Sequence, residues 1–207
     1  MGLPKLPAAV AATIASGDLT RFKEPYQPNS MALEEIASQV TQHGQPRIVQ
    51  WCCDQGFRPP RESLNSEFFS SAVVGASPAV FQVLVDHGFD LNAHESEACS
   101  DALACAVMSG EYEFAKWLLE HGDRATPHDP YHGPSAISWT IRGDSADQEM
   151  LKLLLDHGHD LERSGAGVVA AYEENVEALR LLLDRGLNID DRDIAWYSYD
   201  GDSDESH

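Results

Sequence analysis

The hydrophobic and polar positions of this chain repeat one local pattern five times: an apolar run, two polar residues and a glycine. The glycines are Gly56, Gly88, Gly122, Gly158 and Gly186, so the pattern recurs at intervals of roughly 30 residues. A period of this length indicates stacked supersecondary units, because each unit is too small to bury its own apolar faces. The pattern therefore predicts a solenoid of stacked repeats.

Each unit is expected to contain two short helices. In the clearest case an apolar stretch at residues 104–108 ends in a turn at Gly110, and a second apolar run ends at Gly122. The interval between these glycines leaves room for a second helix of about two to three turns, closed by a glycine in the left-handed conformation. Pro46 and Pro78 stand where second helices are expected to begin, a position at which the missing N–H is harmless.

The repeat ends resemble the ankyrin repeat family, whose unit is a helix, a turn, a second helix and a projecting hairpin. Residues 83–93 (VLVDHGFDLNA), 153–161 (LLLDHGHDL) and 181–189 (LLLDRGLNI) look like that family's Leu-Leu-x-x-Gly-Ala-Asp-Val-Asn ending. Residues 135–139 are similar to its Thr-Pro-Leu-His opening, although the threonine–proline pair is absent from every repeat. The resemblance implies an all-α, ankyrin-type helix-pair solenoid of about five repeats with degenerate N- and C-terminal caps.

Three parts are expected along the chain: an N-terminal capping segment (1–30), the ankyrin-repeat array (31–191) and an acidic C-terminal tail (192–207). Within the first part, residues 14–19 repeat the helix-turn pattern, which favours a degenerate capping repeat. Trp196, with Tyr197 and Tyr199, interrupts the acidic tail. We therefore expect the first half of the tail to dock on the last helix pair and residues 200–207 to be disordered.

The composition excludes some classes of partner. The 207 residues are 43% hydrophobic, which supplies a stacked core, and no apolar run approaches the ~18 residues that a membrane helix needs. There are 34 acidic residues against 14 basic ones, a formal net charge of −20. A nucleic-acid binder needs a basic stripe, which this chain lacks. The acidity favours either solubility or attraction of a basic partner.

The four cysteines are Cys52, Cys53, Cys99 and Cys105, and they form no metal-type pair of pairs. Side chains of the vicinal Cys52 and Cys53 point about 100° apart on a helix, which favours one buried and one partly exposed thiol over a bridge. These cysteines indicate a reducing compartment, so we expect a protein of the cytoplasm or nucleus. We also expect it to be a monomer.

Histidines are the main candidates for chemistry. His87, His121 and His157 each precede a repeat glycine, so the repeat explains them better than catalysis does. Residues 128–132 offer two imidazoles and a carboxylate, which is a candidate metal-binding set, but they lie in a loop that fixes no geometry. A polar loop tip or a partner contact is the favoured interpretation. No phosphate-binding loop or nucleophile elbow is present, and we predict no cofactor, metal or catalytic residue.

Function is expected on the concave face and the loop tips of the solenoid. By resemblance to the family, the residues ahead of each first-helix turn line the concave face, with Val73 and Val74 ahead of Gly75, where an inserted residue disturbs the register. The predicted partner-binding residues are Gln42, His43, Val73, Val74, Met108, Ser109, His128, Tyr131, His132, Arg142, Tyr172 and Glu173.

This surface favours a non-catalytic protein–protein interaction module. The alternatives are an ankyrin-fold enzyme or small-molecule binder with a pocket around His128, His132, Arg142 and Tyr172, and an acidic inhibitor or assembly chaperone for a basic partner. The fold alone does not choose between them.

Overall fold

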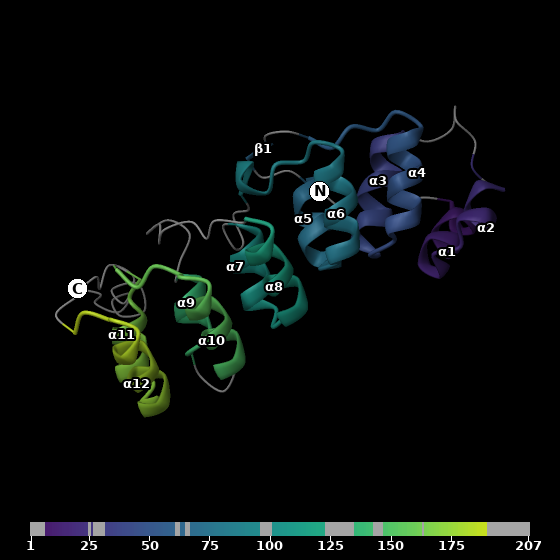
Figure 1. Cartoon of the computed structure of the whole chain (residues 1–207). Helices are drawn as coiled ribbons and strands as arrows, with labels where there is room; N and C mark the ends of the chain where they lie inside the picture. The colour runs from purple at the N-terminus through teal and green to yellow at the C-terminus, as the bar shows by residue number, and fades with distance from the viewer. Residues whose placement is uncertain are drawn as a thin grey trace, which may run out of the picture. The chain divides into compact units, whose positions relative to one another are not determined.

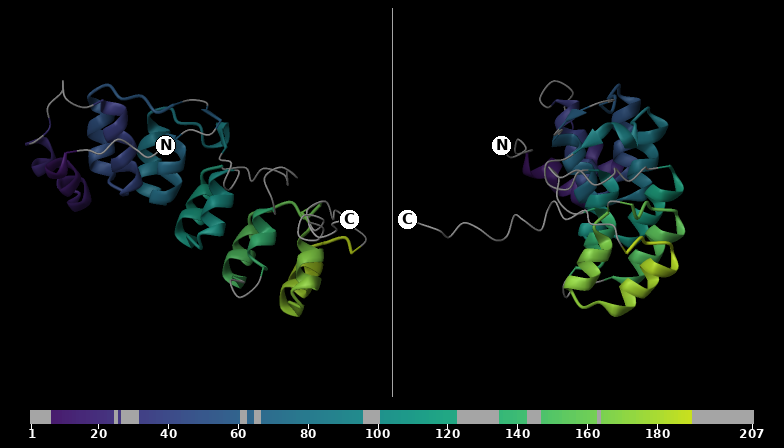
Figure 2. Two further views of the ribbon diagram at one scale, coloured as in Figure 1. Left: turned by 180° about the vertical axis from the view of Figure 1, so that it is seen from behind. Right: turned by 90° about the vertical axis from the view of Figure 1, so that its left-hand side faces the viewer.

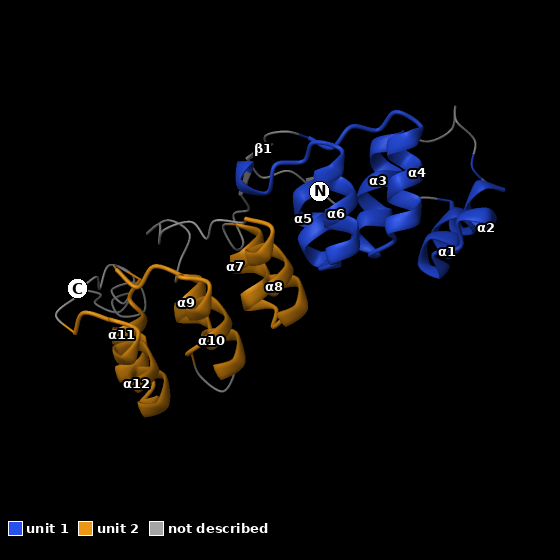
Figure 3. Ribbon diagram, in the orientation of Figure 1, with its two compact units in different colours: residues 1–96 blue, residues 97–207 orange. Residues whose placement is uncertain are grey.

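A computed structural model describes residues 7–24, 26, 32–60, 63–64, 67–95, 101–122, 135–142, 147–162 and 164–189. The chain divides into two compact units, residues 1–96 and 97–207, which are coloured separately in Figure 3. Each unit is described by itself below. Both are built from pairs of short helices, so the prediction of an all-α helix-pair architecture is confirmed.

Unit 1 contains three consecutive helix pairs (Figure 1). They are α1 (Ala8–Ser16) with α2 (Leu19–Lys23), α3 (Leu33–Gln42) with α4 (Pro46–Asp54), and α5 (Glu67–Gly75) with α6 (Pro78–Asp86). The pairs stack in chain order, because α1 contacts α3, α3 contacts α5 and α4 contacts α6. The connectors after the second and third pairs meet in a short parallel bridge between β1 (Ser63–Leu64) and β2 (His94–Glu95), the latter preceded by the 3-10 turn η1 (Leu91–Ala93).

Unit 2 contains three further pairs, seen from two more sides in Figure 2. They are α7 (Ala102–Met108) with α8 (Tyr112–Glu120), α9 (Ala136–Trp139) with α10 (Gln148–Asp156), and α11 (Ala166–Tyr172) with α12 (Val176–Asp184). Helix α9 contacts both α7 and α11, so these pairs also stack in chain order. The largest fully buried side chains come from both units: Phe22, Phe69, Phe81, Phe114, Ile14, Ile36, Ile48, Leu84, Leu103, Leu118, Ile137 and Ile141.

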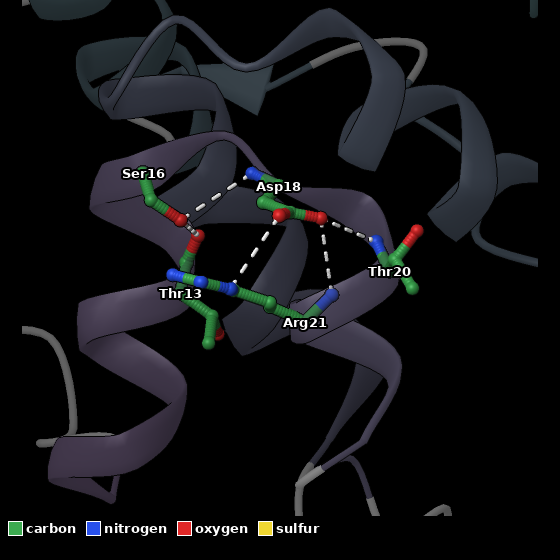
Figure 4. Close-up of polar contacts among 5 residues, drawn as sticks. All are labelled: Thr13, Ser16, Asp18, Thr20 and Arg21. Carbon is green, nitrogen blue, oxygen red and sulfur yellow. Dashed lines mark hydrogen bonds and ion pairs between the residues drawn. The ribbon is translucent and has the colours of Figure 1, made fainter.

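The N-terminal pair shows how polar residues set the helix boundaries (Figure 4). The Asp18 carboxylate accepts hydrogen bonds from the backbone N–H groups of Thr20 (2.9 Å) and Arg21 (3.1 Å), which caps α2. The Arg21 side chain lies 3.7 Å from the same carboxylate, and the Ser16 hydroxyl donates to the Thr13 carbonyl (2.8 Å) at the end of α1. The helix-turn pattern predicted for this segment is therefore a true pair of helices.

The second helices begin and end where the sequence predicts. Pro46 and Pro78 are the first residues of α4 and α6. The repeat glycines adopt positive φ, among them Gly122 (84°) and Gly158 (74°). Each therefore closes its helix in the left-handed conformation, which a residue with a Cβ adopts only at a cost.

The turns between first and second helices correct one prediction. They use positive φ at Gly44 and Gly110 but also at Ala76 (41°) and Glu174 (52°), and all four stand at the same interval before the repeat glycine that follows. The disturbed register predicted near Gly75 is wrong, because Ala76 occupies the regular turn position. Gly75 has a different reason to be small: a Cβ there would lie 2.3 Å from the Thr41 carbonyl oxygen of α3.

The cysteines partly follow expectation. Cys52 and Cys53 are free, so the two vicinal thiols form no bridge, as predicted. Both are buried, however, and the expectation that one is partly exposed is wrong, because the α4 face that carries Cys53 is also covered. Cys105 on α7 is disulfide-bonded, which the prediction of a reducing compartment did not anticipate.

Candidate functional site

Three large apolar side chains are exposed at the ends of first helices. Val74 in the last turn of α5, Met108 at the end of α7 and Tyr172 at the end of α11 are 67%, 42% and 71% exposed. Val74 and Tyr172 lie two residues before the left-handed turn residues Ala76 and Glu174, and Met108 lies two before Gly110. The three positions are therefore equivalent within their repeats. We call this set the helix-end positions.

The corrected register changes the assignment in the third pair of unit 1. Val74, and not Val73, is the equivalent of Met108 and Tyr172, and Val73 is half-buried. The same position in the preceding pair is Gln42, which is exposed, as is the following residue His43. The Nδ1 atom of His43 lies 2.9 Å from the Gln39 carbonyl oxygen, which holds the ring at the end of α3.

In unit 2 the neighbours of the helix-end positions are polar. Ser109 is exposed, and Glu173 is half-buried at the end of α11. Arg142 is half-buried, and its guanidinium carbon lies 5.5 Å from the centroid of the Trp139 ring. This cation–π contact orients the guanidinium on the side of α9. Sequence reasoning named Arg142 as a partner-binding residue but did not identify its contact with Trp139.

The predicted connector residues are not placed by the structure. His128, Tyr131 and His132 lie outside the described residues. In the part of the chain that is described, no group of three or more His, Cys, Asp or Glu side chains is arranged to hold a metal ion. The described helices also include none that is long and apolar enough to cross a membrane.

The histidines before the repeat glycines have a local role. The Nδ1 atoms of His87, His121 and His157 lie 2.7, 2.8 and 2.9 Å from the carbonyl oxygen four residues earlier in the same helix. The Trp117 and Leu153 carbonyls also accept the backbone N–H of His121 (3.1 Å) and His157 (3.2 Å), so each of these two imidazoles adds a second contact to a carbonyl at its helix end. This supports the repeat-based interpretation of these residues.

A polar pocket of about 800 Å³ lies at the ends of α10 and α12, and sequence reasoning missed it. It is lined by His159, Asp160, Glu162 and Arg185, among others, and Arg185 forms an ion pair with Asp156 at 2.6 Å. Burial lowers the pKa of His159, against smaller opposing effects of Asp101 and Asp160. The imidazole is therefore held neutral near physiological pH.

A second pocket of about 520 Å³ is mainly apolar and lies against α11, where Tyr172 forms part of its wall. Arg142 lines neither of these two pockets. The described residues therefore do not bring Arg142 and Tyr172 together in either one, and the alternative small-molecule site receives no support from them.

Comparison with known sequences identifies the repeat type. Residues 106–193 match the family description "Ankyrin repeats (3 copies)". A putative ankyrin repeat protein of Rickettsia felis (strain ATCC VR-1525 / URRWXCal2) is 30% identical over 120 residues, which cover 54% of this chain and 38% of that protein. Ankyrin repeat and SOCS box protein 14 of Homo sapiens is 36% identical over 66 residues, 30% of this chain and 11% of that protein. The chain thus spans well under half the length of these relatives.

Comparison with solved structures supports the same fold. The ankyrin repeat domain of Bcl-3, described as a unique member of the IkappaB protein family, aligns with a TM-score of 0.69 at 20% identity and covers 89% of each chain. EF0377, an ankyrin repeat protein, aligns with a TM-score of 0.64 at 21% identity over 87% of this chain and 98% of that one. The resemblance stated from the sequence is confirmed: residues 106–193 match ankyrin repeats, and the fold is that of an ankyrin-type helix-pair solenoid. Ankyrin repeats generally mediate contacts between proteins.

Proposed function

We propose that this chain is a non-catalytic protein–protein interaction module that binds a partner through its helix-end positions and their neighbours. The observation that carries the proposal is the exposure of Val74, Met108 and Tyr172 at one repeated position. The other residues proposed for contact are Gln42, His43, Val73, Ser109, His128, Tyr131, His132, Arg142 and Glu173.

The physical argument is one of position as well as exposure. Single exposed apolar side chains are common and need no explanation. Recurrence is different: the repeated fold exposes this position in each of these units, and an apolar side chain nevertheless occupies it in three of them. Tyr, Met and Arg are also enriched at protein interfaces, where a few such anchors supply most of the binding energy. Val74, Met108, Tyr172 and Arg142 are therefore the proposed anchors in the two units.

The net charge of −20 extends the proposal to a partner with a basic surface. Long-range attraction accelerates association with such a partner, and salt shortens its range from about 30 Å at 0.01 M to about 8 Å at physiological strength. We expect the association rate with the captured partner to fall steeply over that range in a stopped-flow experiment. If the association rate does not depend on salt, the net negative charge does not attract the partner and its role is in solubility.

Affinity capture with the full chain tests the contact residues. Met108→Glu and Tyr172→Ala should each weaken partner capture while the helical circular dichroism and the melting temperature stay near those of the parent. Lys116→Ala is the matched control for Met108→Glu, since it changes the charge by the same amount at an exposed position on α8 of the same repeat. The control should bind as the parent does.

If both variants capture the partner as well as the parent and the control, the contact surface lies elsewhere on the chain. Capture lost equally in Lys116→Ala would indicate a general effect of charge and not a contact at Met108.

We also propose that the chain is a monomer, and light scattering of the purified chain tests this.

The proposal of a cytoplasmic or nuclear location has a direct chemical test. Alkylation of the protein in its source cells, followed by mass spectrometry, reports whether each thiol is free. A reducing compartment predicts that Cys105 is alkylated before any reductant is added. Recovery of Cys105 only in a disulfide would place the protein in an oxidising environment.

A further inference from the structure

The last helix pair exposes an apolar face. On α11, Val168, Ala171 and Tyr172 follow the i, i+3, i+4 spacing of one helix side, and on α12, Val176, Leu179 and Leu183 follow i, i+3, i+7. Tyr172 is 71% exposed, Val176 56% and Leu183 40%. We call these six residues the terminal face.

The position of this face in unit 2 makes its exposure unusual. Helix α9 is contacted by α7 on one side and by α11 on the other, so an internal first helix is covered by the next repeat. Among the described residues no helix follows α12. A terminal repeat of a solenoid is normally polar on its outer side, because nothing else shields it from water. The terminal face lacks that polar character, which indicates that another segment covers it.

The path of the chain after α12 identifies the segment. The N–H of Leu187 donates to the Leu182 carbonyl at 3.0 Å, and the chain then returns to α11. There Leu187 packs so closely over Gly167 that a Cβ on the glycine would lie 2.8 Å from Leu187 Cδ2. Leu187, Asn188 and Ile189 line the apolar pocket of about 520 Å³ together with Val168 and Leu179. The residues that follow Ile189 therefore start at the rim of that pocket.

We propose that residues 190–199 bind to the terminal face of their own chain, with the Trp196 side chain in the apolar pocket. Trp196 is seven residues beyond Ile189, and at ~3.3–3.6 Å per extended residue it reaches any point along α11, which is ~10 Å long. An indole buries about 150–250 Å² and is the largest apolar group in this segment. Ile194 and Tyr197 supply further apolar surface beside it.

The docking must be driven by apolar contact and not by charge. The segment carries Asp190, Asp191 and Asp193 against one cation, Arg192. The last pair exposes Glu174, Glu177 and Asp184 against Arg180 and Arg185, so both sides are net acidic and the net charges oppose the approach. Salt screens this repulsion. Docking should therefore persist or increase as the salt concentration rises, which is the opposite of the behaviour proposed for a basic partner. Because Tyr172 belongs both to the terminal face and to the helix-end positions, the docked segment competes with a partner at the last repeat.

Photo-crosslinking in the full chain tests the proposal. The variant Trp196→p-benzoylphenylalanine should crosslink within the same chain to peptides of α11 and α12, several-fold more than the control Glu205→p-benzoylphenylalanine. Products are separated by size and mapped by mass spectrometry. Adding Leu179→Glu, which places a charge on the pocket wall, should abolish the crosslink while the circular dichroism stays unchanged.

Three results would overturn the proposal. They are equal crosslinking from positions 196 and 205, crosslinks from position 196 only to a second copy of the chain, and a crosslink that survives Leu179→Glu. If Leu179→Glu does not fold, Val176→Glu takes its place, since Val176 is more than half exposed and tolerates a charge. The experiment needs no partner, so its failure leaves the proposed function untouched.

Discussion

Replacement of Gly75 by alanine tests a close backbone contact between α3 and α5. Gly75 is the last residue of α5, and a Cβ there would lie 2.3 Å from the Thr41 carbonyl oxygen and 3.1 Å from that of Gln42. Both atoms belong to the backbone of α3, so no side-chain rotation relieves the contact. We expect Gly75→Ala to destabilise the protein, although alanine is the better helix former.

The magnitude follows from two opposing effects. Alanine gains at most about 1 kcal/mol over glycine in a helix, and less at a helix end. To reach an ordinary contact distance the two helices must separate by about 1 Å, and a gap of that size forfeits a quarter to a half of each dispersion contact across the interface. Overpacking of this kind typically costs about 1–3 kcal/mol. The net loss in unfolding free energy should be about 2 kcal/mol.

Gly167→Ala is the matched comparison. Gly167 is also helical and has no positive φ, and its added Cβ would lie 2.8 Å from Leu187 Cδ2. That atom is the end of a flexible side chain, so Leu187 can move and the stability should change by less than about 1 kcal/mol. Urea unfolding followed by circular dichroism measures both variants, and native-state hydrogen exchange assigns the Gly75→Ala loss to α3 and α5. A Gly75→Ala protein as stable as its parent would refute the contact.

Three further changes have defined outcomes. Gly122→Ala should lower the unfolding free energy by about 1 kcal/mol or more in urea titrations. Its φ is 84° and the added Cβ would meet no neighbouring atom within 4 Å, so the cost is conformational alone. Ala76→Gly should raise it by roughly 0.5 kcal/mol, since relief of the left-handed strain at φ 41° exceeds the entropy cost of glycine. Burial raises the pKa of the Cys52 thiol from 9.0 to about 12, and the nearby Cys53 is a smaller cause. The folded state therefore favours the neutral thiol, and the stability that this contributes is complete below pH 9 and is lost as the pH rises toward 12. Denaturant titrations between pH 8 and 11 should show a steeper loss for the parent than for Cys52→Ala.

Each of these has a contrary result. If Gly122→Ala is as stable as the parent or more stable, the assignment of Gly122 as a left-handed helix cap is wrong. Loss of stability in Ala76→Gly would mean that the left-handed turn carries no strain. Equal pH slopes for the parent and Cys52→Ala would show that the thiol ionises as freely in the folded chain as in the unfolded one.

Local features of the sequence determined the helix ends. Pro46 and Pro78 begin helices, because proline fixes its own φ and lacks the backbone N–H. Gly122 and Gly158 close helices, because glycine lacks a Cβ and adopts positive φ at no steric cost. Their effect needs no distant partner. The same holds for Asp18, whose carboxylate caps the helix that follows it within three residues. The helix-pair repeat was therefore readable from the sequence.

Tertiary structure decided what depends on residues far apart in the chain. Gly75 looks like the turn glycine of its repeat, but it is small because α5 approaches the Thr41 carbonyl of the preceding repeat closely. The left-handed turn position is occupied by Ala76. No local pattern distinguishes a glycine needed for φ from one needed for close approach. The sequence prediction named both Val73 and Val74, and that distinction makes Val74 the equivalent of Met108 and Tyr172.

The same limit applies to the candidate surfaces. Periodicity identified Met108 and Tyr172 as helix-end residues, but their exposure depends on which neighbouring repeat covers them. The apolar pocket beside Tyr172 exists because Leu187 returns from the end of α12 to Gly167 on α11. Sequence alone determined where the helices start and stop, since those signals act over three or four residues. Only packing between repeats decided which apolar side chains remain available for binding.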